Sequence, residues 1–209
     1  MRGCYHSYMK RILLIGPILF ATVVTTLTII KYDFLRGLGW DPIRDPTFDW
    51  PSGLSLGAYG FIMTATFIIS GLLMSALALR LYSDLKPGAA TIMGSFLLVC
   101  AGLALAGLAF TTDPTIRSTP ATWHGRLHDT SFVLLGLSLM PAMIFLGAAL
   151  RDDTRWRSYG LYTWITAALA IPTFVLKGAA FYVFLLAILL WTELVAWKLV
   201  KDASSPKLR

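Results

Sequence analysis

One stretch of the chain decides its fold: residues 123–150, which read WHGRLHDTSFVLLGLSLMPAMIFLGAAL. The part from 130 to 150 contains no charged side chain. As an α-helix with a rise of 1.5 Å per residue it would be ~32 Å long, which matches the ~30 Å hydrocarbon layer of a bilayer. The stretch therefore predicts a transmembrane helix, preceded by a short polar segment that holds two histidines, an arginine and an aspartate.

The rest of the chain has the same apolar character. Of its 209 residues, 56% are hydrophobic and 14% are charged, and the mean hydropathy is +0.68. This composition excludes an ordinary soluble domain and indicates that the solvent is lipid. Apolar segments long enough to span a bilayer occupy residues 12–30, 54–79, 89–110, 130–150, 158–176 and 179–200. We therefore predict an all-α, polytopic integral membrane bundle of six transmembrane helices that forms a single domain over residues 1–209.

The net charge of +7 is informative once it is divided between the two sides of the membrane, because Lys and Arg concentrate in cytoplasmic loops. With the N-terminus inside, only six of the 18 basic residues fall on the outer side: Lys31, Arg36, Arg44, Arg117, Arg126 and Lys177. This distribution predicts a multi-pass protein of the cell membrane with both termini in the cytoplasm. The basic excess then reflects topology and contact with anionic membrane lipid, and we expect no nucleic-acid partner.

The predicted outer segments, residues 31–53 and 111–123, are longer than the cytoplasmic ones and rich in Pro, Asp, Trp and Thr. They contain three Asp-Pro pairs, at 41–42, 45–46 and 113–114. Such pairs are typical of turns and helix caps. The alternative is that the outer aspartates converge on the histidine pair as carboxylate partners; these are Asp41, Asp45, Asp49 and Asp113.

The fourth predicted helix should begin before the hydrocarbon does. Thr119 is a suitable N-cap and Pro120 a suitable first helical residue. On a helix that starts there, the side chains of His124, His128 and Ser131 share one face, because they follow the i, i+4, i+7 spacing. Asp129 lies beside that face, Arg126 belongs to the same polar segment, and Trp123 is placed at the membrane interface.

Three interpretations of this cluster remain open. The first is a metal site, in which the two histidines and an outer aspartate bind zinc; no third histidine is expected on this side, because His6 is predicted to be cytoplasmic. The second is a site for proton transfer or anion binding, in which imidazoles act as acid or base and an arginine holds a carboxylate or phosphate. The third is structural: the same groups hydrogen-bond neighbouring loops and stabilise them.

Glu193 is a secondary candidate. It is the only glutamate in the chain and falls inside the last predicted span, between Trp191 and Trp197. An ionisable group within a membrane helix is costly and is therefore a functional candidate. The alternative is a carboxylate that reaches the interface near Lys198.

Two short motifs resemble a known family. The segment Phe110-Thr111-Thr112-Asp113-Pro114, followed by Thr122-Trp123-His124-Gly125-Arg126-Leu127-His128, resembles the DUF998 family of bacterial and archaeal membrane proteins. This resemblance implies a six-helix fold and a focus on Asp113, His124 and His128. The function of that family is unknown, so the resemblance implies no reaction.

Two other families are more distantly similar. In membrane hydrolases related to alkaline ceramidases and adiponectin receptors, His, Asp and Ser groups surround zinc, but this chain lacks a third zinc-binding histidine on a late helix. Small integral-membrane terpene cyclases protonate an alkene or epoxide with an acidic residue. Here that residue would be Asp113, Asp129 or Glu193, and the aromatic residues, 13% of the chain, could stabilise the resulting carbocations.

We therefore expect an integral membrane protein that binds or chemically processes a lipid or isoprenoid-like amphiphile. The expected site is an outward-facing pocket between the third and fourth helices and the first outer loop. The predicted catalytic residues are His124, His128, Asp113 and Asp129, and the predicted substrate-binding residues are Arg126, Trp123 and Ser131. We predict no cofactor, with zinc as the alternative. The competing functions are a terpene cyclase-like acid catalyst, a zinc-dependent lipid hydrolase and a non-catalytic membrane binding or assembly protein.

Overall fold

The computed structural model describes residues 12–114, 121–176 and 178–204. Within these residues the chain is helical and forms no strand, which confirms the all-α prediction. The six long helices are α2 (Ile15–Ile30), α4 (Gly60–Asp84), α5 (Ala89–Gly107), α6 (Trp123–Asp152), α7 (Arg157–Leu176) and α8 (Ala180–Ser204). Two short helices, α3 (Tyr32–Gly37) and the 3-10 helix η1 (Ser52–Ser55), lie in the long connection between α2 and α4.

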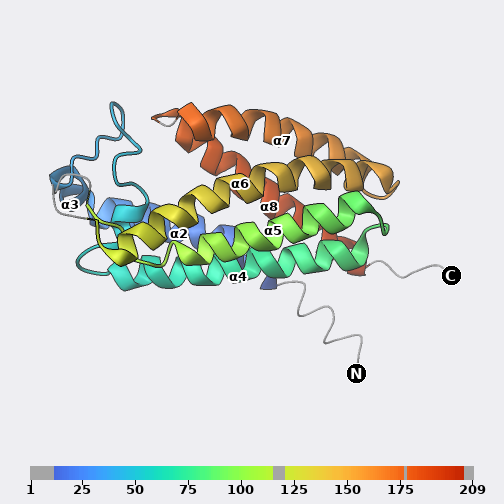
Figure 1. Ribbon diagram of the computed structural model, residues 1–209, viewed down its shortest axis with the longest axis horizontal. Helices are drawn as coiled ribbons and strands as arrows, with labels where there is room; N and C mark the ends of the chain where they lie inside the picture. The colour runs from blue at the N-terminus through green and yellow to red at the C-terminus, as the bar shows by residue number, and fades with distance from the viewer. Residues whose placement is uncertain (1–11, 115–120, 177, 205–209) are drawn as a thin grey trace, which may run out of the picture.

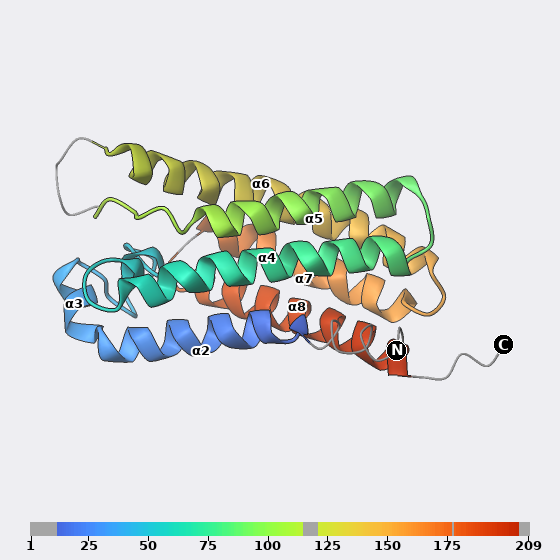
Figure 2. The same cartoon turned by 90° about the horizontal axis from the view of Figure 1, so that it is seen from below.

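The six long helices form a closed ring. Each packs against the next along the chain, from α2 and α4 through α5, α6 and α7 to α8, and α8 contacts α2 again. They run lengthwise along the molecule (Figures 1 and 2). In a regular hexagon of helices the centre lies one interhelical distance, about 8–10 Å, from every helix axis. The middle of such a ring has room for a seventh helix and must be filled by side chains or remain hollow.

The two ends of the ring differ. One end, here called the loop end, holds the α2–α4 connection (residues 31–59), the described parts of the α5–α6 connection (residues 108–114 and 121–122), the end of α7 and the start of α8 (Figure 1). The opposite end holds the short α4–α5 and α6–α7 turns and the end of α8 (Figure 2). The candidate site described below lies at the loop end.

The ring has the surface of a membrane protein. Helices α4, α5, α6 and α8 are long and apolar enough to cross a bilayer, and α2 is a shorter apolar helix. Large apolar side chains are exposed on the outside of the ring, such as Ile18, Phe61 and Leu137. An apolar outer surface on several such helices is stable in lipid and not in water. The chain is therefore a multi-pass membrane protein.

Small residues let the helices approach closely. A Cβ atom added to Gly102 of α5 would lie 2.6 Å from the carbonyl oxygen of Gly71 and 2.3 Å from Oγ of Ser75, both on α4. Gly94, Gly107 and Gly136 make close contacts of the same kind with neighbouring helices. The helix pairs α4–α5 and α5–α6 are thus held at backbone contact distance, and Gly136 of α6 leaves room for the Phe174 ring of α7.

Two predicted helix starts are wrong. The span predicted at 54–79 begins too early, because α4 starts at Gly60 and ends at Asp84. Leu54 lies in η1, where its side chain is fully buried, so its apolar character reflects packing at the loop end and not membership of the membrane helix. The fourth long helix starts at Trp123 with Thr122 as its N-cap, whereas Pro120 was predicted as its first residue; Thr119 and Pro120 themselves lie outside the described residues.

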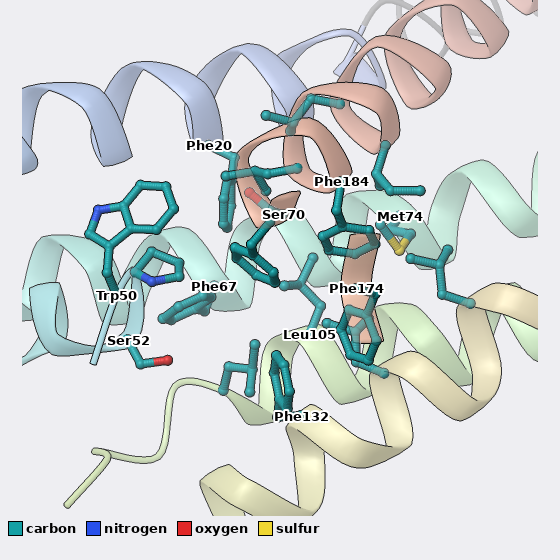
Figure 3. A pocket seen from close by; sticks show the side chains of 18 of the residues that line it. Phe20, Trp50, Ser52, Phe67, Ser70, Met74, Leu105, Phe132, Phe174 and Phe184 are labelled. Carbon is teal, nitrogen blue, oxygen red and sulfur yellow. The ribbon is translucent and has the colours of Figure 1, made fainter. Parts of the chain in front are cut away.

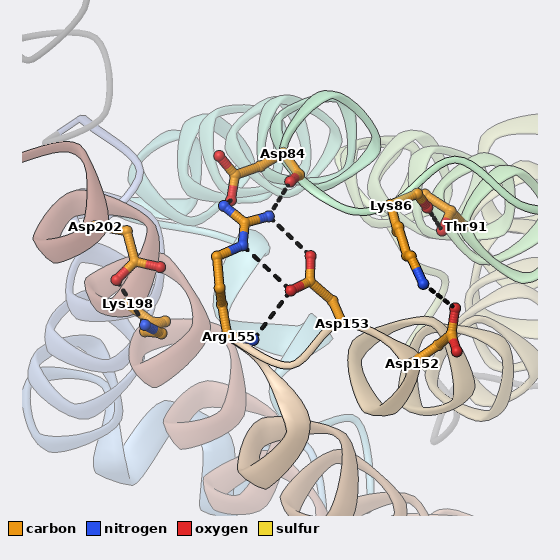
Figure 4. Close-up of polar contacts among 8 residues, drawn as sticks. All are labelled: Asp84, Lys86, Thr91, Asp152, Asp153, Arg155, Lys198 and Asp202. Atoms are coloured by element: carbon orange, nitrogen blue, oxygen red, sulfur yellow. Dashed lines mark hydrogen bonds and ion pairs between the residues drawn. The ribbon is translucent and has the colours of Figure 1, made fainter. Parts of the chain in front are cut away.

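Ion pairs close the end of the ring opposite the loops (Figure 4). Arg155 lies in the α6–α7 turn and donates hydrogen bonds to Oδ2 of Asp153 (2.8 Å) and to the carbonyl oxygen of Asp84 at the end of α4 (2.6 Å). The second salt bridge joins Lys86 to Asp152 across 3.6 Å. Lys86 and Asp152 are largely exposed, so their ion pair orients the turns more than it adds to the free energy of unfolding. Asp153, by contrast, is buried beside Arg155.

Candidate functional site

A cavity of about 360 Å³ lies inside the ring and is lined by residues from all six long helices. Figure 3 shows phenylalanine side chains around it, with Trp50 and Ser52 near one end and Met74 near the other. The apolar lining includes Phe20, Phe67, Leu105, Phe132, Phe174 and Phe184. The volume falls in the ~300–1,000 Å³ range of small-molecule sites, which are mostly apolar with a few polar groups.

Most of the polar lining residues gather at the loop end. Seven of them come from the connecting segments or the first turns of α6: Thr47, Asp49, Ser52, Thr112, Asp113, His128 and Asp129. The other two, Ser70 of α4 and Thr192 of α8, donate their hydroxyl groups to the backbone carbonyl oxygens of Gly16 and Ile188. On α6 the lining runs from His128 to Leu139, a rise of about 16 Å at 1.5 Å per residue. The cavity is therefore polar at one end and apolar over the remaining length of that helix face.

His128 is buried and uses both ring nitrogens. Its Nδ1 faces two backbone carbonyl oxygens, that of Phe110 at 2.8 Å and that of Leu108 at 3.1 Å. Its Nε2 lies 2.9 Å from Oγ of Ser52. Carbonyl oxygens only accept hydrogen bonds, so Nδ1 carries a proton, and in the neutral imidazole Nε2 is the acceptor for the serine hydroxyl. His128 thus joins α6 to the end of α5 and to η1.

Asp113 and Thr122 build the start of α6. Oδ2 of Asp113 accepts the backbone N–H of Thr122 at 2.7 Å, and Oδ1 accepts its hydroxyl at 2.7 Å. The same hydroxyl oxygen accepts the backbone N–H of Gly125 at 3.1 Å, which is N-cap geometry. A Cβ atom on Gly125 would lie 2.1 Å from Oδ2 of Asp113, so only glycine fits beside the carboxylate.

His124 belongs to this capping network. Its Nδ1 lies 3.0 Å from the carbonyl oxygen of Thr111 and 2.9 Å from Oγ1 of Thr122, so this nitrogen also carries a proton. The ring of Trp123 packs edge-on against His124 and Phe110. His124 is not among the residues that line the cavity. The two histidines therefore share a helix face, but only His128 reaches the cavity.

The carboxyl group of Asp113 is held in its ionised form. The hydrogen bonds from the side chain and backbone of Thr122 lower its pKa below the ordinary aspartate value, although partial desolvation opposes this. A carboxylate that accepts two hydrogen bonds is a positioning group. It is poorly suited to donate a proton at neutral pH, as an acid catalyst would have to do.

The α2–α4 connection is anchored by a buried lysine. The ammonium group of Lys31 is a donor to the carbonyl oxygens of Leu54 (2.9 Å) and Leu56, and it lies 4.8 Å from the centre of the Phe34 ring. Burial lowers its pKa. The hydrogen bonds from Lys31 fix η1 on the end of α2 and thereby hold Ser52 in place.

The remaining predicted residues lie at different distances from the cavity. Asp129 lines it, whereas Arg126 and Trp123 are exposed and Ser131 packs against Gly107 of α5. Glu193 is not a lining residue, and its Oε2 is buried without a hydrogen-bond partner among the described residues.

The outer aspartates converge only in part. Asp49 and Asp113 line the cavity with His128. Asp41 instead forms a turn, in which Oδ1 accepts the N–H groups of Ile43 and Arg44 at 2.9 Å and Oδ2 pairs with Arg36 at 2.6 Å. Asp45 forms a backbone bridge with Asp41. The turn interpretation is therefore confirmed for the first Asp-Pro pair.

Two site residues escaped the sequence analysis, Ser52 and Lys31. Ser52 lies 76 positions before His128, in a Trp-Pro-Ser-Gly turn that carries no motif. Lys31 entered the prediction only as one of the six basic residues on the outer side. A lysine directly after an apolar span and next to a Pro/Gly-rich loop could have indicated an anchor, but no spacing rule connects Ser52 to the histidines.

The donor set does not fit zinc. Within residues 12–114, 121–176 and 178–204, no group of three His, Cys, Asp or Glu side chains comes together as metal ligands. The Nδ1–H groups that donate to carbonyl oxygens are compatible with zinc at Nε2, but Nε2 of His128 faces Ser52 and only His128 of the two histidines lines the cavity. Zinc needs at least three donors that converge on one point. His6, the other histidine, lies outside the described residues.

Fold and site together define a multi-pass helical membrane protein with an internal cavity that is polar at one end. The chain belongs to the family described as protein of unknown function, DUF998, whose profile matches residues 14–198. Neither the curated proteins nor the solved structures include a match to this chain.

The hydrogen bonds to Asp113 predict an acid-sensitive start of α6. Because the folded state lowers the pKa of this carboxyl group, its contribution to stability is present above the unfolded aspartate pKa of ~3.9 and is lost as the pH falls through the lower folded value. Asp113→Asn should lower the melting temperature in detergent at pH 7. The melting temperature of Asp113→Asn should also fall less between pH 5 and pH 3 than that of the wild type.

The matched control is Asp33→Asn, which changes an exposed aspartate on α3. Its melting temperatures should follow the wild-type values across the same pH range. Superimposable pH curves for wild type and Asp113→Asn would show that Asp113 does not stabilise the start of α6 as a carboxylate.

Proposed function

We propose that this protein is a six-span membrane protein whose ring holds a lipid or isoprenoid-like amphiphile. In this proposal the polar head group lies at the loop end beside His128 and the apolar chain extends between the phenylalanine side chains. One observation carries the proposal: a single cavity with polar groups at one end and an aromatic and aliphatic lining beyond them. An amphiphile matches both parts at once.

The head group would meet hydrogen-bonding and acidic side chains. Asp49, Ser52, Thr112, His128 and Asp129 line the polar end. Arg126 is exposed outside the cavity. These groups favour a head group that offers hydrogen-bond donors or ester and hydroxyl oxygens.

The aromatic lining supports a second candidate, a terpene cyclase-like acid catalyst. Phe20, Phe67, Phe132, Phe174 and Phe184 could stabilise cationic intermediates of an isoprenoid. The acid would then be Asp129, because Asp113 is held as a carboxylate. Turnover of an isoprenoid that is lost in Asp129→Asn would favour this candidate over plain binding.

The proposed topology places the loop end outside the cell and both termini in the cytoplasm. Because α2 and α7 close the ring, we place these two helices at the same depth as the four helices that are long and apolar enough to cross a bilayer. Basic residues concentrate at the opposite end, as expected for a cytoplasmic face; examples are Arg80, Lys86, Arg151, Arg155 and Arg157.

Cysteine labelling tests this orientation. In a background with Cys4 and Cys100 changed to serine, Ile43→Cys in the α2–α4 connection should react with a membrane-impermeant maleimide in intact cells. Lys86→Cys at the opposite end should react only after permeabilisation. Both native side chains are well exposed, with values of 83% for Ile43 and 65% for the Lys86 side chain, so access is not limited by the fold. The reverse labelling pattern would overturn the proposed sidedness.

A cavity-filling substitution tests the binding proposal. Leu105 lines the cavity from α5, whereas Leu103 on the same helix points outwards and is 56% exposed. Leu105→Trp should occupy the space of the bound chain and reduce the amphiphile that co-purifies with the protein by about tenfold or more, a change of at least ~1.4 kcal/mol in binding. Mass spectrometry of extracts from the purified protein provides the measurement.

Leu103→Trp is the matched control and should retain the wild-type amount of bound amphiphile. Both variants must elute as folded protein on size exclusion. An empty wild-type cavity, or equal occupancy in Leu105→Trp and Leu103→Trp, would contradict the proposal. Those results would favour the assembly function, in which His128 only ties α6 to the neighbouring loops.

A further inference from the structure

We propose that Ser52 and His128 form a nucleophile–base pair that cleaves a carboxylic ester of the amphiphile bound in the cavity. This inference rests on the proposed function, because the ring must first hold a chain whose ester group reaches the loop end. It goes further by naming a reaction and an attacking atom. Ser52 was not a candidate from the sequence.

The hydrogen-bond directions suit this role. Nδ1 of His128 is a donor to the carbonyl oxygens of Phe110 and Leu108, at 2.8 and 3.1 Å. The lone pair of the neutral ring is then on Nε2, which faces Oγ of Ser52 at 2.9 Å. A base that takes the proton of a nucleophilic hydroxyl needs this tautomer and a separation of about 2.6–3.2 Å.

A third group orients the base, as activated serines require. Here two backbone carbonyl oxygens at the end of α5 accept the hydrogen bond from Nδ1, a role that a carboxylate often has in such sites. Their negative ends point at Nδ1–H, so they fix the ring plane and stabilise the imidazolium that forms when Nε2 accepts a proton. His128 is only 3% exposed, which leaves the ring little freedom to turn.

The nucleophile is held by a different part of the chain. Ser52 is the first residue of η1, and Lys31 fixes that helix through the carbonyl oxygens of Leu54 and Leu56. The indole N–H of Trp50 donates to Oγ1 of Thr28 at 2.9 Å and ties the preceding residues to α2. Serine and histidine therefore come from separate elements that are each anchored to a long helix.

Both side chains face the space where the ester would lie. Ser52 and His128 line the cavity at its polar end, and Phe132 follows one helical turn after His128 on the same face of α6. Figure 3 shows Ser52 beside the aromatic side chains of the cavity. An acyl chain among those aromatic groups would place its carbonyl carbon near Oγ of Ser52.

The reaction balances without a cofactor. Oγ of Ser52 attacks the ester carbonyl carbon while its proton moves to Nε2 of His128. The tetrahedral intermediate then expels the alcohol, which takes that proton from Nε2, and an acyl ester remains on Ser52. Water adds to this ester in the same way, its proton passes through Nε2 back to Oγ, and a carboxylic acid leaves.

A long-chain alkyl fluorophosphonate tests the pair on the full-length protein in detergent. Oγ of an activated serine displaces fluoride and leaves a phosphonate adduct that peptide mass spectrometry can locate. The expected result is an adduct on Ser52 in the wild type and none at this position in Ser52→Ala. His128→Gln should slow adduct formation by about 10²–10⁴-fold, the usual contribution of a general base.

Ser55→Ala is the matched control. Ser55 lies in the same 3-10 helix, its hydroxyl donates to the carbonyl oxygen of Ser52 at 2.7 Å, and it does not line the cavity. This variant should be labelled like the wild type. His128 also holds the end of α5, so the labelling rate of His128→Gln is measured only on protein that elutes as folded on size exclusion. The adduct on Ser52 in the wild type can be tested without any variant.

The outcomes separate this inference from the proposed function. A wild type that carries amphiphile but gives no adduct on Ser52 overturns the reaction and leaves the binding proposal intact. Equal labelling rates in the wild type and in folded His128→Gln overturn the role of His128 as base. A wild type without bound amphiphile overturns the proposed function and removes the basis of the inference.

Discussion

Six helices packed in a ring enclose a centre that none of the described helices occupies, and the rest of this structure follows from that geometry. The centre of such a ring lies about 8–10 Å from each helix axis, so inward-facing side chains must span that distance to meet. Phenylalanines from α2, α4, α6, α7 and α8 extend into it, yet a cavity of about 360 Å³ remains. Protein interiors are normally close-packed, so a cavity of this size indicates a binding site.

The polar end of the cavity is built from segments that must also close the ring. Asp113 holds Thr122, the N-cap of α6, and Lys31 holds η1 on the end of α2. His128 joins the end of α5 to η1. Each of these groups is satisfied by backbone or hydroxyl partners, as buried polar groups require. The same hydrogen bonds that order the loops leave the Ser52 hydroxyl and Nε2 of His128 directed at each other inside the cavity lining.

Much of the fold could be predicted because lipid imposes a strong constraint on composition. Uncharged runs such as 130–150 mark helices, and the structure has a long helix at each predicted segment. Boundaries were less predictable: Leu54 is apolar because it packs inside the loop end, and hydropathy cannot separate that cause from membrane burial.

The site was only partly predictable for a similar reason. Helical spacing correctly places His124 and His128 on one face of α6, but it cannot say which of them faces a cavity. That depends on the order of helices around the ring. The contact between Ser52 and His128 joins residues 76 positions apart and follows from tertiary packing alone.

The central claim is that an elongated amphiphile occupies the middle of the ring with its head at His128. A cryo-electron microscopy map of the wild-type protein, purified in lipid nanodiscs without added ligand, tests it most directly. The account predicts continuous elongated density between Phe67 and Phe132 that ends within hydrogen-bond distance of Ser52 or His128. A ring whose inward side chains close the cavity, or one that contains no elongated density, would contradict it.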